Sequence, residues 1–456
     1  MLRPFRSLCA TLALALMALA ALPPTPAHAV MNALDPVPAA TVLFPYFEVD
    51  LANPGGATTL LTVANSSASA ALVRVTIWSD ANLPVFSFPI YLTGYDLASI
   101  NVRDILNGIL PTSATAGGDP SDTISPKGPV SQDINFSSCN GNPQDPGSDR
   151  LPMAALGAGA IADLRAALTG AAVPNGTLIG VAAGQCTGRN YGDNVARGYI
   201  TMDSVFACYR LTPANGATYF GNGGIADTRN ILWGEYTVVD PANNLAYGDL
   251  ATMIEAVNVA PVAGTYTFYG RFVGADGSDK REGLATSWLV QGERDSTQMQ
   301  YWRDTRIALN PAAVGFSCGT SPAPQPMGRQ FAGAFNFDST PDNAPVATIF
   351  GTPIAKVPLS NADTGMTSTK KIGQFRAGLR TTIVDPNVVV FSAPTVVFNP
   401  QTGQFEAGFA PDPSLTQGLI TSVRRPKSGA GRFQSGAVSV PMDQVATPDS
   451  FNPLQN

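Results

Sequence analysis

The chain has 456 residues, of which 45% are hydrophobic and only 13% charged, and it contains 44 glycines and 38 prolines. This apolar content is too high for a generally disordered chain, and the abundance of Gly and Pro is typical of a turn-rich fold. The net charge of −6 and the absence of a basic block argue against a nucleic-acid-binding protein, because an acidic surface repels phosphate.

The first 29 residues have the three parts of a secretory signal peptide. Arg3 and Arg6 form a basic start, residues 8–22 are apolar, and Ala27-His28-Ala29 is a small-x-small cleavage signal. A transmembrane anchor is the weaker alternative, because the apolar run is shorter than the ~20 residues that span a bilayer. We expect cleavage before Val30, a periplasmic, cell-surface or extracellular location, and no transmembrane segment in the mature chain.

Loss of the signal peptide changes the chemistry that the chain can support. His28 is the only histidine, so the mature chain has none, and its 25 Lys and Arg against 33 Asp and Glu give a net charge of −8. Without histidine, the commonest zinc and non-haem iron sites and the serine–histidine pairs of hydrolases are excluded.

Four cysteines remain after the expected cleavage: Cys139, Cys186, Cys208 and Cys318. An even number in an exported chain favours two disulfides. Three pairings are open to four cysteines, and the spacing does not choose between them. A zinc site is disfavoured, because the chain lacks C-x-x-C spacing among these four.

In chain order, the first predicted elements are strands. Residues 58–64, 71–78 and 85–92 are rich in β-branched and aromatic residues and are separated by turn signals. Pro89 within the third predicts an edge strand or a bulge. Residues 96–106 fit either a strand or a short helix. This spacing of short strands is typical of a β-sandwich.

A loop-like stretch and a helix follow. Residues 111–150 are mostly Gly, Pro, Ser, Asp and Asn, which is linker composition, and we expect a disulfide at Cys139 to hold part of them. Residues 153–169 predict the best helix of the chain, with apolar positions every four residues and Gly170 as its end. We expect it to cover one face of a sheet.

Strand patterns return after the helix. The candidates are residues 177–183, 196–209, 230–239, 264–273 and 285–291, with a pair of short strands around Pro394 in the last third.

The predicted fold is mainly β, with a β-sandwich of immunoglobulin-like or jelly-roll-like architecture, one short helix and long loops. Whether residues 30–320 form two sandwiches or one interleaved unit stays open. The predicted regions are residues 1–29 (signal peptide), 30–110 (β-sandwich), 111–150 (linker or loop), 151–320 (second β-rich region with the helix) and 321–456 (looser β region with a flexible tail).

Four segments resemble a group of uncharacterised exported bacterial proteins. They are Leu43–Asp50, Asn230–Tyr236, Thr267–Arg271 and Trp302–Asp304. The resemblance spans residues 38–320 and implies a secreted β-sandwich. It carries no activity, cofactor or catalytic residue.

Two catalytic patterns occur in the chain. Gly315-Phe316-Ser317-Cys318-Gly319 matches the nucleophile-elbow pattern, but a serine nucleophile needs a base and no histidine is left to serve. A glycosidase needs two carboxylates at a set separation, for which Glu48, Glu235, Glu255, Glu282 and Glu293 are available. Spacing in the sequence does not pair them, so we predict no catalytic residue.

Loop carboxylates provide a candidate calcium site, and Ca²⁺ is the one cofactor that the sequence allows. Asp276 and Asp279 lie in one predicted turn, while Asp240 and Asp249 flank another. Turns use the same residues, so a plain turn is the competing interpretation.

Three aromatic residues are the candidates for ligand binding. Tyr247 and Tyr301 lie near predicted loops and are expected to be exposed, and Trp302 adjoins them. Exposed rings on a sandwich stack on sugars, whereas buried rings fill the core.

The sequence therefore favours a secreted or cell-surface, non-catalytic β-sandwich protein that binds a glycan or a surface protein or has a structural role. The alternative is a carboxylate-based carbohydrate-active enzyme of the glycoside hydrolase type. A third interpretation is a calcium-stabilised surface-layer or adhesin component.

Overall fold

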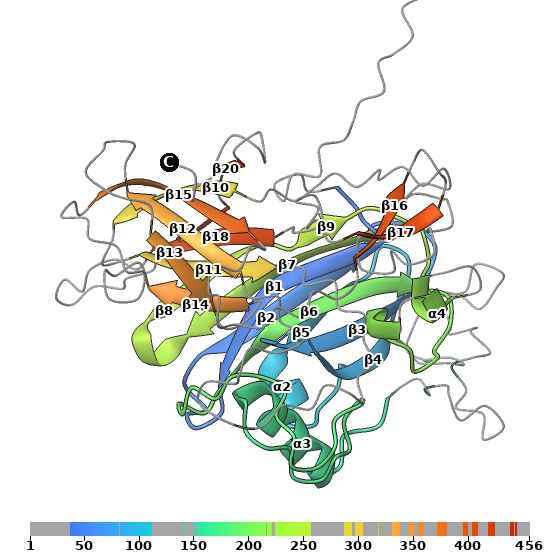
Figure 1. Cartoon of the computed structure of the whole chain (residues 1–456). Helices are drawn as coiled ribbons and strands as arrows, with labels where there is room; N and C mark the ends of the chain where they lie inside the picture. Colours follow the sequence, from blue (N-terminus) through green and yellow to red (C-terminus); the bar gives the residue numbers. More distant parts are fainter. Residues whose placement is uncertain are drawn as a thin grey trace, which may run out of the picture.

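The computed structural model describes residues 37–81, 83–111, 153–215, 217–220 and 224–256, the isolated residues 139, 149 and 318, and the strands between residues 287 and 444. The fold is mainly β, as the sequence predicts, with antiparallel sheets that pack face to face as a β-sandwich (Figure 1).

Two sheets form the sandwich. The five-stranded sheet has the order β4-β3-β6-β1-β9, and the four-stranded sheet has the order β5-β2-β7-β8. Their strands are β1 (Thr41–Asp50), β2 (Thr58–Asn65), β3 (Ala71–Ser79), β4 (Pro84–Leu92), β5 (Leu97–Asn101), β6 (Val195–Val205), β7 (Leu232–Asp240), β8 (Leu245–Leu250) and β9 (Thr252–Ile254).

The strands on either side of residues 111–150 interleave. β6 lies between β1 and β3, and β7 pairs with β2, so both sheets combine strands from residues 41–101 with strands from residues 195–254. Residues 37–256 therefore form one interleaved unit, which answers the question that the sequence leaves open. Residues 111–150 are an excursion from this unit and not a boundary between two sandwiches.

Strand β1 is buried on both faces, and a bulge at Pro45 decides which of its side chains point to each face. The register with β6 shifts between Phe44 and Phe47, so that Val42, Phe44 and Phe47 all contribute to the core between the two sheets. Pro45 has no N–H to donate to a ladder, which makes this a natural place for a bulge. Tyr46 and Glu48 consequently lie on the other face of the sheet, which belongs to a second buried cluster.

The second cluster is closed by strands from the last third of the chain. Trp302 on β11 (Thr297–Arg303) and Ile354 on β14 (Ile354–Pro358) pack with Leu43 and Tyr46 of β1. β11 and β14 belong to a four-stranded sheet that also contains β18 (Gly418–Arg424) and β19 (Val438–Pro441), in the order β14-β11-β18-β19. In Figure 1 these strands lie against one side of the sandwich.

The remaining described strands form one five-stranded sheet and one hairpin. The sheet has the order β13-β12-β15-β10-β20, and the hairpin is β16-β17. Their bounds are β10 (Ser287–Glu293), β12 (Phe331–Phe337), β13 (Val346–Phe350), β15 (Ile372–Arg380), β16 (Thr395–Asn399), β17 (Gln404–Gly408) and β20 (Asp443–Gln444).

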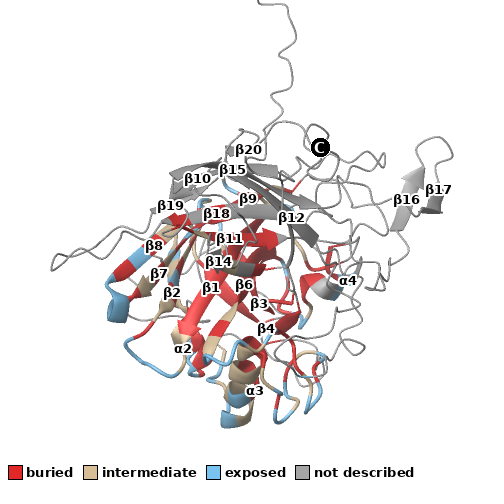
Figure 2. Cartoon of the chain, turned by 60° about the vertical axis from the view of Figure 1, so that its left-hand side comes forward, coloured by how far each residue is buried: buried red, intermediate tan, exposed pale blue. Residues whose placement is uncertain are grey.

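Short helices close the opposite end of the sandwich (Figures 1 and 2). α2 (Val102–Leu106) directly continues β5, so residues 96–106 contain both of the alternatives that the sequence allows. α3 (Ala158–Thr169) is the predicted helix; it begins five residues later than expected, after Gly157, and ends at Gly170, whose positive φ of 71° caps it. Leu164, Ala167 and Leu168 bury its apolar side in the main core. The other helical turns are α4 (Ala217–Phe220), η2 (Pro213–Asn215) and η3 (Pro241–Asn243).

The predicted strand at residues 177–183 is wrong: the structure describes turns there. The buried carboxylate of Asp163 on α3 accepts hydrogen bonds from the backbone N–H groups of Asn175 (2.7 Å) and Thr177 (2.7 Å) and from both of their side chains. These bonds hold the segment in turns that follow the helix. Of the other predicted strands, residues 264–273 lie outside the described residues.

Two disulfides are confirmed, and their pairing is resolved. Cys139 pairs with Cys208, and Cys186 pairs with Cys318. The first ties Cys139, as expected, to Cys208, and the Asp149 carboxylate binds Arg74 (2.5 Å) and Arg210 (2.8 Å). None of the described helices is long and apolar enough to cross a membrane. The predicted signal peptide, residues 1–29, lies outside the described residues.

Candidate functional site: a groove at the open edge of β5

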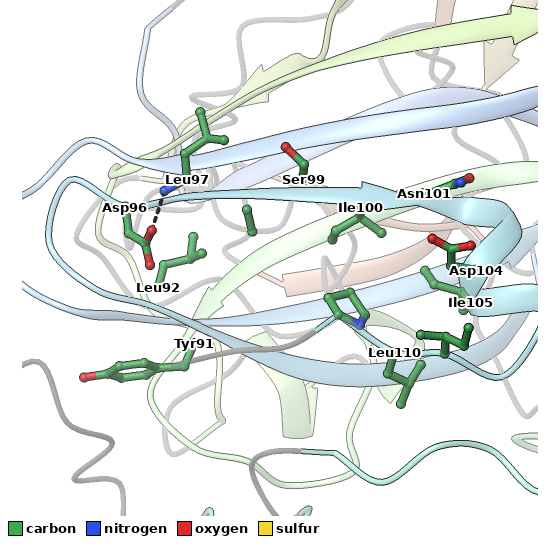
Figure 3. Close-up of a pocket in the computed structure, with 13 residues that line it drawn as sticks. Tyr91, Leu92, Asp96, Leu97, Ser99, Ile100, Asn101, Asp104, Ile105 and Leu110 are labelled. Atoms are coloured by element: carbon green, nitrogen blue, oxygen red, sulfur yellow. Dashed lines mark hydrogen bonds between the residues drawn. The ribbon is translucent and has the colours of Figure 1, made fainter. Parts of the chain in front are cut away.

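The candidate site lies where the sandwich is open between its edge strands β4 and β5. A groove of about 390 Å³ is lined by one continuous stretch of chain, from the end of β4 through β5 and α2 to Pro111 (Figure 3). Its apolar lining includes the buried side chains of Leu92, Ile100, Ile105 and Leu110. The groove is therefore a trough of mixed polar and apolar lining alongside an edge strand.

Successive side chains of β5 point to opposite faces of the sheet, as in any strand with one buried face. Ile100 points into the groove, whereas Leu97 and Ser99 point away from it, onto the outer face of the four-stranded sheet (Figure 3). Leu97 is 56% exposed, and Ile109 beyond α2 is 60% exposed. Both apolar side chains are therefore open to solvent beside the groove.

The open edge of β5 presents backbone hydrogen-bonding groups. The Asn65 N–H donates to the Asp96 carbonyl (2.9 Å), so in the antiparallel alternation Ala98 and Ile100 also turn their backbone groups toward β2. The carbonyl of Leu97, the N–H and carbonyl of Ser99 and the N–H of Asn101 then face outward. In the described part of the chain, no hydrogen bond engages these four groups. They form a template on which a further strand can pair.

Carboxylates mark both ends of the groove (Figure 3). Asp96 accepts hydrogen bonds from the backbone N–H groups of Thr93 (3.0 Å) and Leu97 (2.8 Å) and closes the β4–β5 turn. Asp104 lies exposed in the first turn of α2, at the other end. The neighbouring Arg103 does not neutralise it, because its guanidinium donates to backbone carbonyls between Asp50 and Ala57. The groove thus combines apolar side chains with polar groups and has a carboxylate at each end.

A second group of polar residues is buried where β11 and β14 cover β1. The ammonium of Lys356 lies 2.6 and 2.5 Å from the two carboxylate oxygens of Glu48. The hydroxyl of Tyr46 donates to Oε2 (3.0 Å) and that of Tyr247 donates to Oε1 (3.3 Å). Gln300 in turn donates from Nε2 to the Tyr247 hydroxyl (2.8 Å). We call these five residues the Glu48 centre.

Electrostatics keep the Glu48 centre ionised. Burial acts to raise the pKa of Glu48, but the charge and hydrogen bonds of Lys356 and the Tyr46 hydroxyl outweigh it and lower that pKa. Burial and the adjacent carboxylate raise the pKa of Tyr46, which therefore stays a hydroxyl donor. The Lys356 ammonium also lies 5.7 Å from the centre of the Tyr46 ring and 5.8 Å from that of Tyr247, within reach of cation–π attraction.

The aromatic residues expected to bind a ligand are buried. Tyr247 (3% exposed), Tyr301 (2%) and Trp302 (0%) lie within strands β8 and β11. The expectation of exposure for Tyr247 and Tyr301 is wrong, because β11 packs on the sandwich and leaves neither ring at a loop. Trp302 contacts the edge of the Tyr199 ring, at 5.9 Å between ring centres. These three residues are core residues.

The candidate calcium ligands do not converge. Asp240 accepts hydrogen bonds from the backbone and side chain of Asn243 and caps η3, which is the turn interpretation. It pairs with Leu245 while Asp249 pairs with Tyr236, four residues or about 13 Å along the ladder. Among the described residues no group of three His, Cys, Asp or Glu side chains could hold a metal ion. Asp276 and Asp279 lie outside them.

The carboxylates expected for a glycosidase are equally dispersed where the structure describes them. Glu48 is buried and bound to Lys356, and Glu235 is exposed on the outer face of β7. Glu282, the side chain of Glu293 and Ser317 lie outside the described residues, and Cys318 of the same motif is engaged in a disulfide.

Sequence reasoning missed the groove and the Glu48 centre. The groove depends on which strand ends each sheet, and a periodic pattern does not show this. The available signal was an apolar run, Leu97 to Leu110, with only Asp104 and Arg103 charged. Comparison with known proteins adds no assignment: no family model, no curated protein and no solved structure matches the chain.

Proposed function

We propose that this is an exported, non-catalytic binding protein that takes up an extended peptide segment of a partner protein by strand addition to β5. The observation that carries the proposal is the outward-facing backbone of Leu97, Ser99 and Asn101 beside a groove that is lined partly by apolar side chains. In strand addition, backbone hydrogen bonds supply affinity and pockets beneath alternate side chains supply specificity.

The groove also indicates the chemistry of the partner segment. Alternate apolar side chains would enter the trough over Leu92, Ile100 and Ile105, and basic residues at both ends would meet Asp96 and Asp104. β5 spans five residues, so the segment that pairs is about five residues long, or roughly 17 Å. A glycan partner has less support, because the aromatic residues expected to stack on sugars are buried.

The test is a binding titration with fluorescein-labelled Lys-Val-Thr-Val-Thr-Val-Lys, followed by fluorescence anisotropy. We expect saturable binding to the wild type and loss of at least about tenfold in affinity in Ser99→Pro, which removes an outward N–H without touching the β2 ladder. Ser99→Thr, which keeps the N–H and favours a strand, is the matched control. Equal binding by all three proteins, or by none, would contradict strand addition at β5.

A further inference from the structure

The Glu48 centre places an amine, a carboxamide and a carboxylate together in a buried environment. Gln300 on β11 and Lys356 on β14 lie directly opposite each other in the antiparallel register, so both side chains project to the same face. Glu48 on β1 contacts the Lys356 amine through both oxygens and reaches Gln300 through Tyr247. The side chains of Lys356 and Glu48 are only 12% and 8% exposed.

The carboxamide of Gln300 is incompletely satisfied for a buried group. Gln300 is 3% exposed, and its Oε1 has no hydrogen-bond partner among the described residues, although Nε2 donates to Tyr247. An unpaired buried carbonyl destabilises the fold, because it has lost its hydrogen bonds to water. The carboxamide thus has a costly environment, and its reactive carbon lies on the same face as a buried amine.

We propose that Lys356 and Gln300 join in an intramolecular amide bond, with Glu48 as the proton-transfer group. In the minor form of the ion pair, in which Glu48 holds one proton of Lys356, the neutral Nζ attacks Cδ of Gln300. The Nζ–Cδ bond forms and the Cδ–Nε2 bond breaks. Nε2 leaves with the bonding electrons and takes up the two protons released by Nζ, through Glu48 and the Tyr247 hydroxyl, as an ammonium ion. No oxidant, reductant or external reactant is needed.

The surroundings supply a base for the amine and a hydrogen-bonded path to the leaving nitrogen. The Glu48 carboxylate lies within hydrogen-bond reach of Nζ, which is the first condition for a general base. The Tyr247 hydroxyl bridges Glu48 and the leaving Nε2. Folding brings the groups together without loss of translational freedom at the moment of reaction, and burial limits hydrolysis of the product. The resulting bond would tie β11 to β14 where they cover β1.

Mass spectrometry of the folded mature protein tests the proposal directly. After reduction and tryptic digestion, we expect the peptide 295–303 joined to 330–370, uncut at Lys356, with a mass equal to the sum of the two minus one ammonia. Recovery of only the linear peptides 295–303, 330–356 and 357–370 would overturn the proposal. A Lys356–Glu48 link with loss of water would also overturn it.

Variants separate the bond from a structural role of the same residues. Gln300→Glu is expected to give the same linked product, now with loss of water. Gln300→Met, of similar volume but without the acyl carbon, is expected to give linear peptides only. Glu48→Gln should retain intact Gln300 and Lys356. If Glu48→Gln does not fold, the wild type and the two Gln300 variants still decide, because a linked product in Gln300→Met would contradict the proposal.

Discussion

The edge strands β4 and β5 flank the same groove, yet only β5 can accept another strand. β4 contains Pro84 and Pro89, both buried, and each lacks the N–H that a ladder needs. It also packs against α3. β5 contains no proline and turns the backbone groups of Ser99 outward. Natural proteins blunt sheet edges with prolines to prevent pairing. The difference between the two edges therefore indicates that β4 is protected and β5 is kept competent for pairing.

The largest expected effect is on stability and comes from removing the hydrogen bonds of Asp163 on α3, the helix that packs against β4. Asp163→Ala removes the charged acceptor of four part-buried hydrogen bonds from Asn175 and Thr177, so we expect a loss of about 3 kcal/mol in the free energy of unfolding. Urea denaturation measures this. Asp163→Asn, which keeps one acceptor oxygen, is the matched control and should lose clearly less. Equal losses in both would show that the carboxylate charge, rather than the hydrogen bonds, holds the turn.

The next largest effect on stability distinguishes the backbone N–H groups of β5 that face β2 from those that face outward. Ala98→Pro removes an N–H that faces β2, so we expect about 1–3 kcal/mol lower stability, whereas Ser99→Pro should change it by less than about 0.5 kcal/mol. Thermal and urea unfolding of both variants provide the comparison. The reverse order would mean that the outward and inward sides of β5 are assigned wrongly.

Directly after β3, in the turn that leads to β4, a buried carboxylate makes stability depend on pH. Burial raises the pKa of Asp80 to about 7, although the Arg189 backbone N–H binds it. Because the folded pKa exceeds the unfolded one, this group lowers stability as pH rises from about 4 to 7, and the loss persists above 7. We expect Asp80→Asn to be about 2 kcal/mol more stable than wild type at pH 8.

This gain should disappear near pH 4, where Asp80 is protonated in the folded protein. Unfolding curves at several pH values measure it. If the stability gain of Asp80→Asn does not depend on pH, its cause is not titration of Asp80. The cause would then be packing against Gly188, which lies close to the Asp80 carboxylate.

The smallest effect concerns the acidic ends of the groove. Asp104→Asn should weaken binding of the basic-ended peptide by about 0.5–1 kcal/mol at low salt, and the difference should shrink at high salt, because exposed charges are screened. Anisotropy titrations at two ionic strengths measure this. An unchanged affinity at low salt would remove the charge argument for the partner while leaving strand addition at β5 in place.

Local patterns allowed much of the fold to be predicted, whereas the site depended on contacts between distant segments. Alternation placed β2, β3 and β4, and Pro89 indicated an edge strand, because these features depend on neighbouring residues. The strand expected at residues 177–183 is wrong because Asp163, on the preceding helix, holds that segment in turns. The same reason explains Trp302, which is buried because β11 packs on β1.

The central claim, that β5 has an open edge which binds a peptide, is tested most directly by residue-resolved amide hydrogen exchange. We predict that the N–H groups of Ser99 and Asn101 exchange rapidly in the free protein while those of Ala98 and Ile100 are protected. Saturation with Lys-Val-Thr-Val-Thr-Val-Lys should then slow Ser99 and Asn101 selectively. Protection of Ser99 already in the free protein, or rapid exchange at Ser99 with peptide bound, would contradict the account.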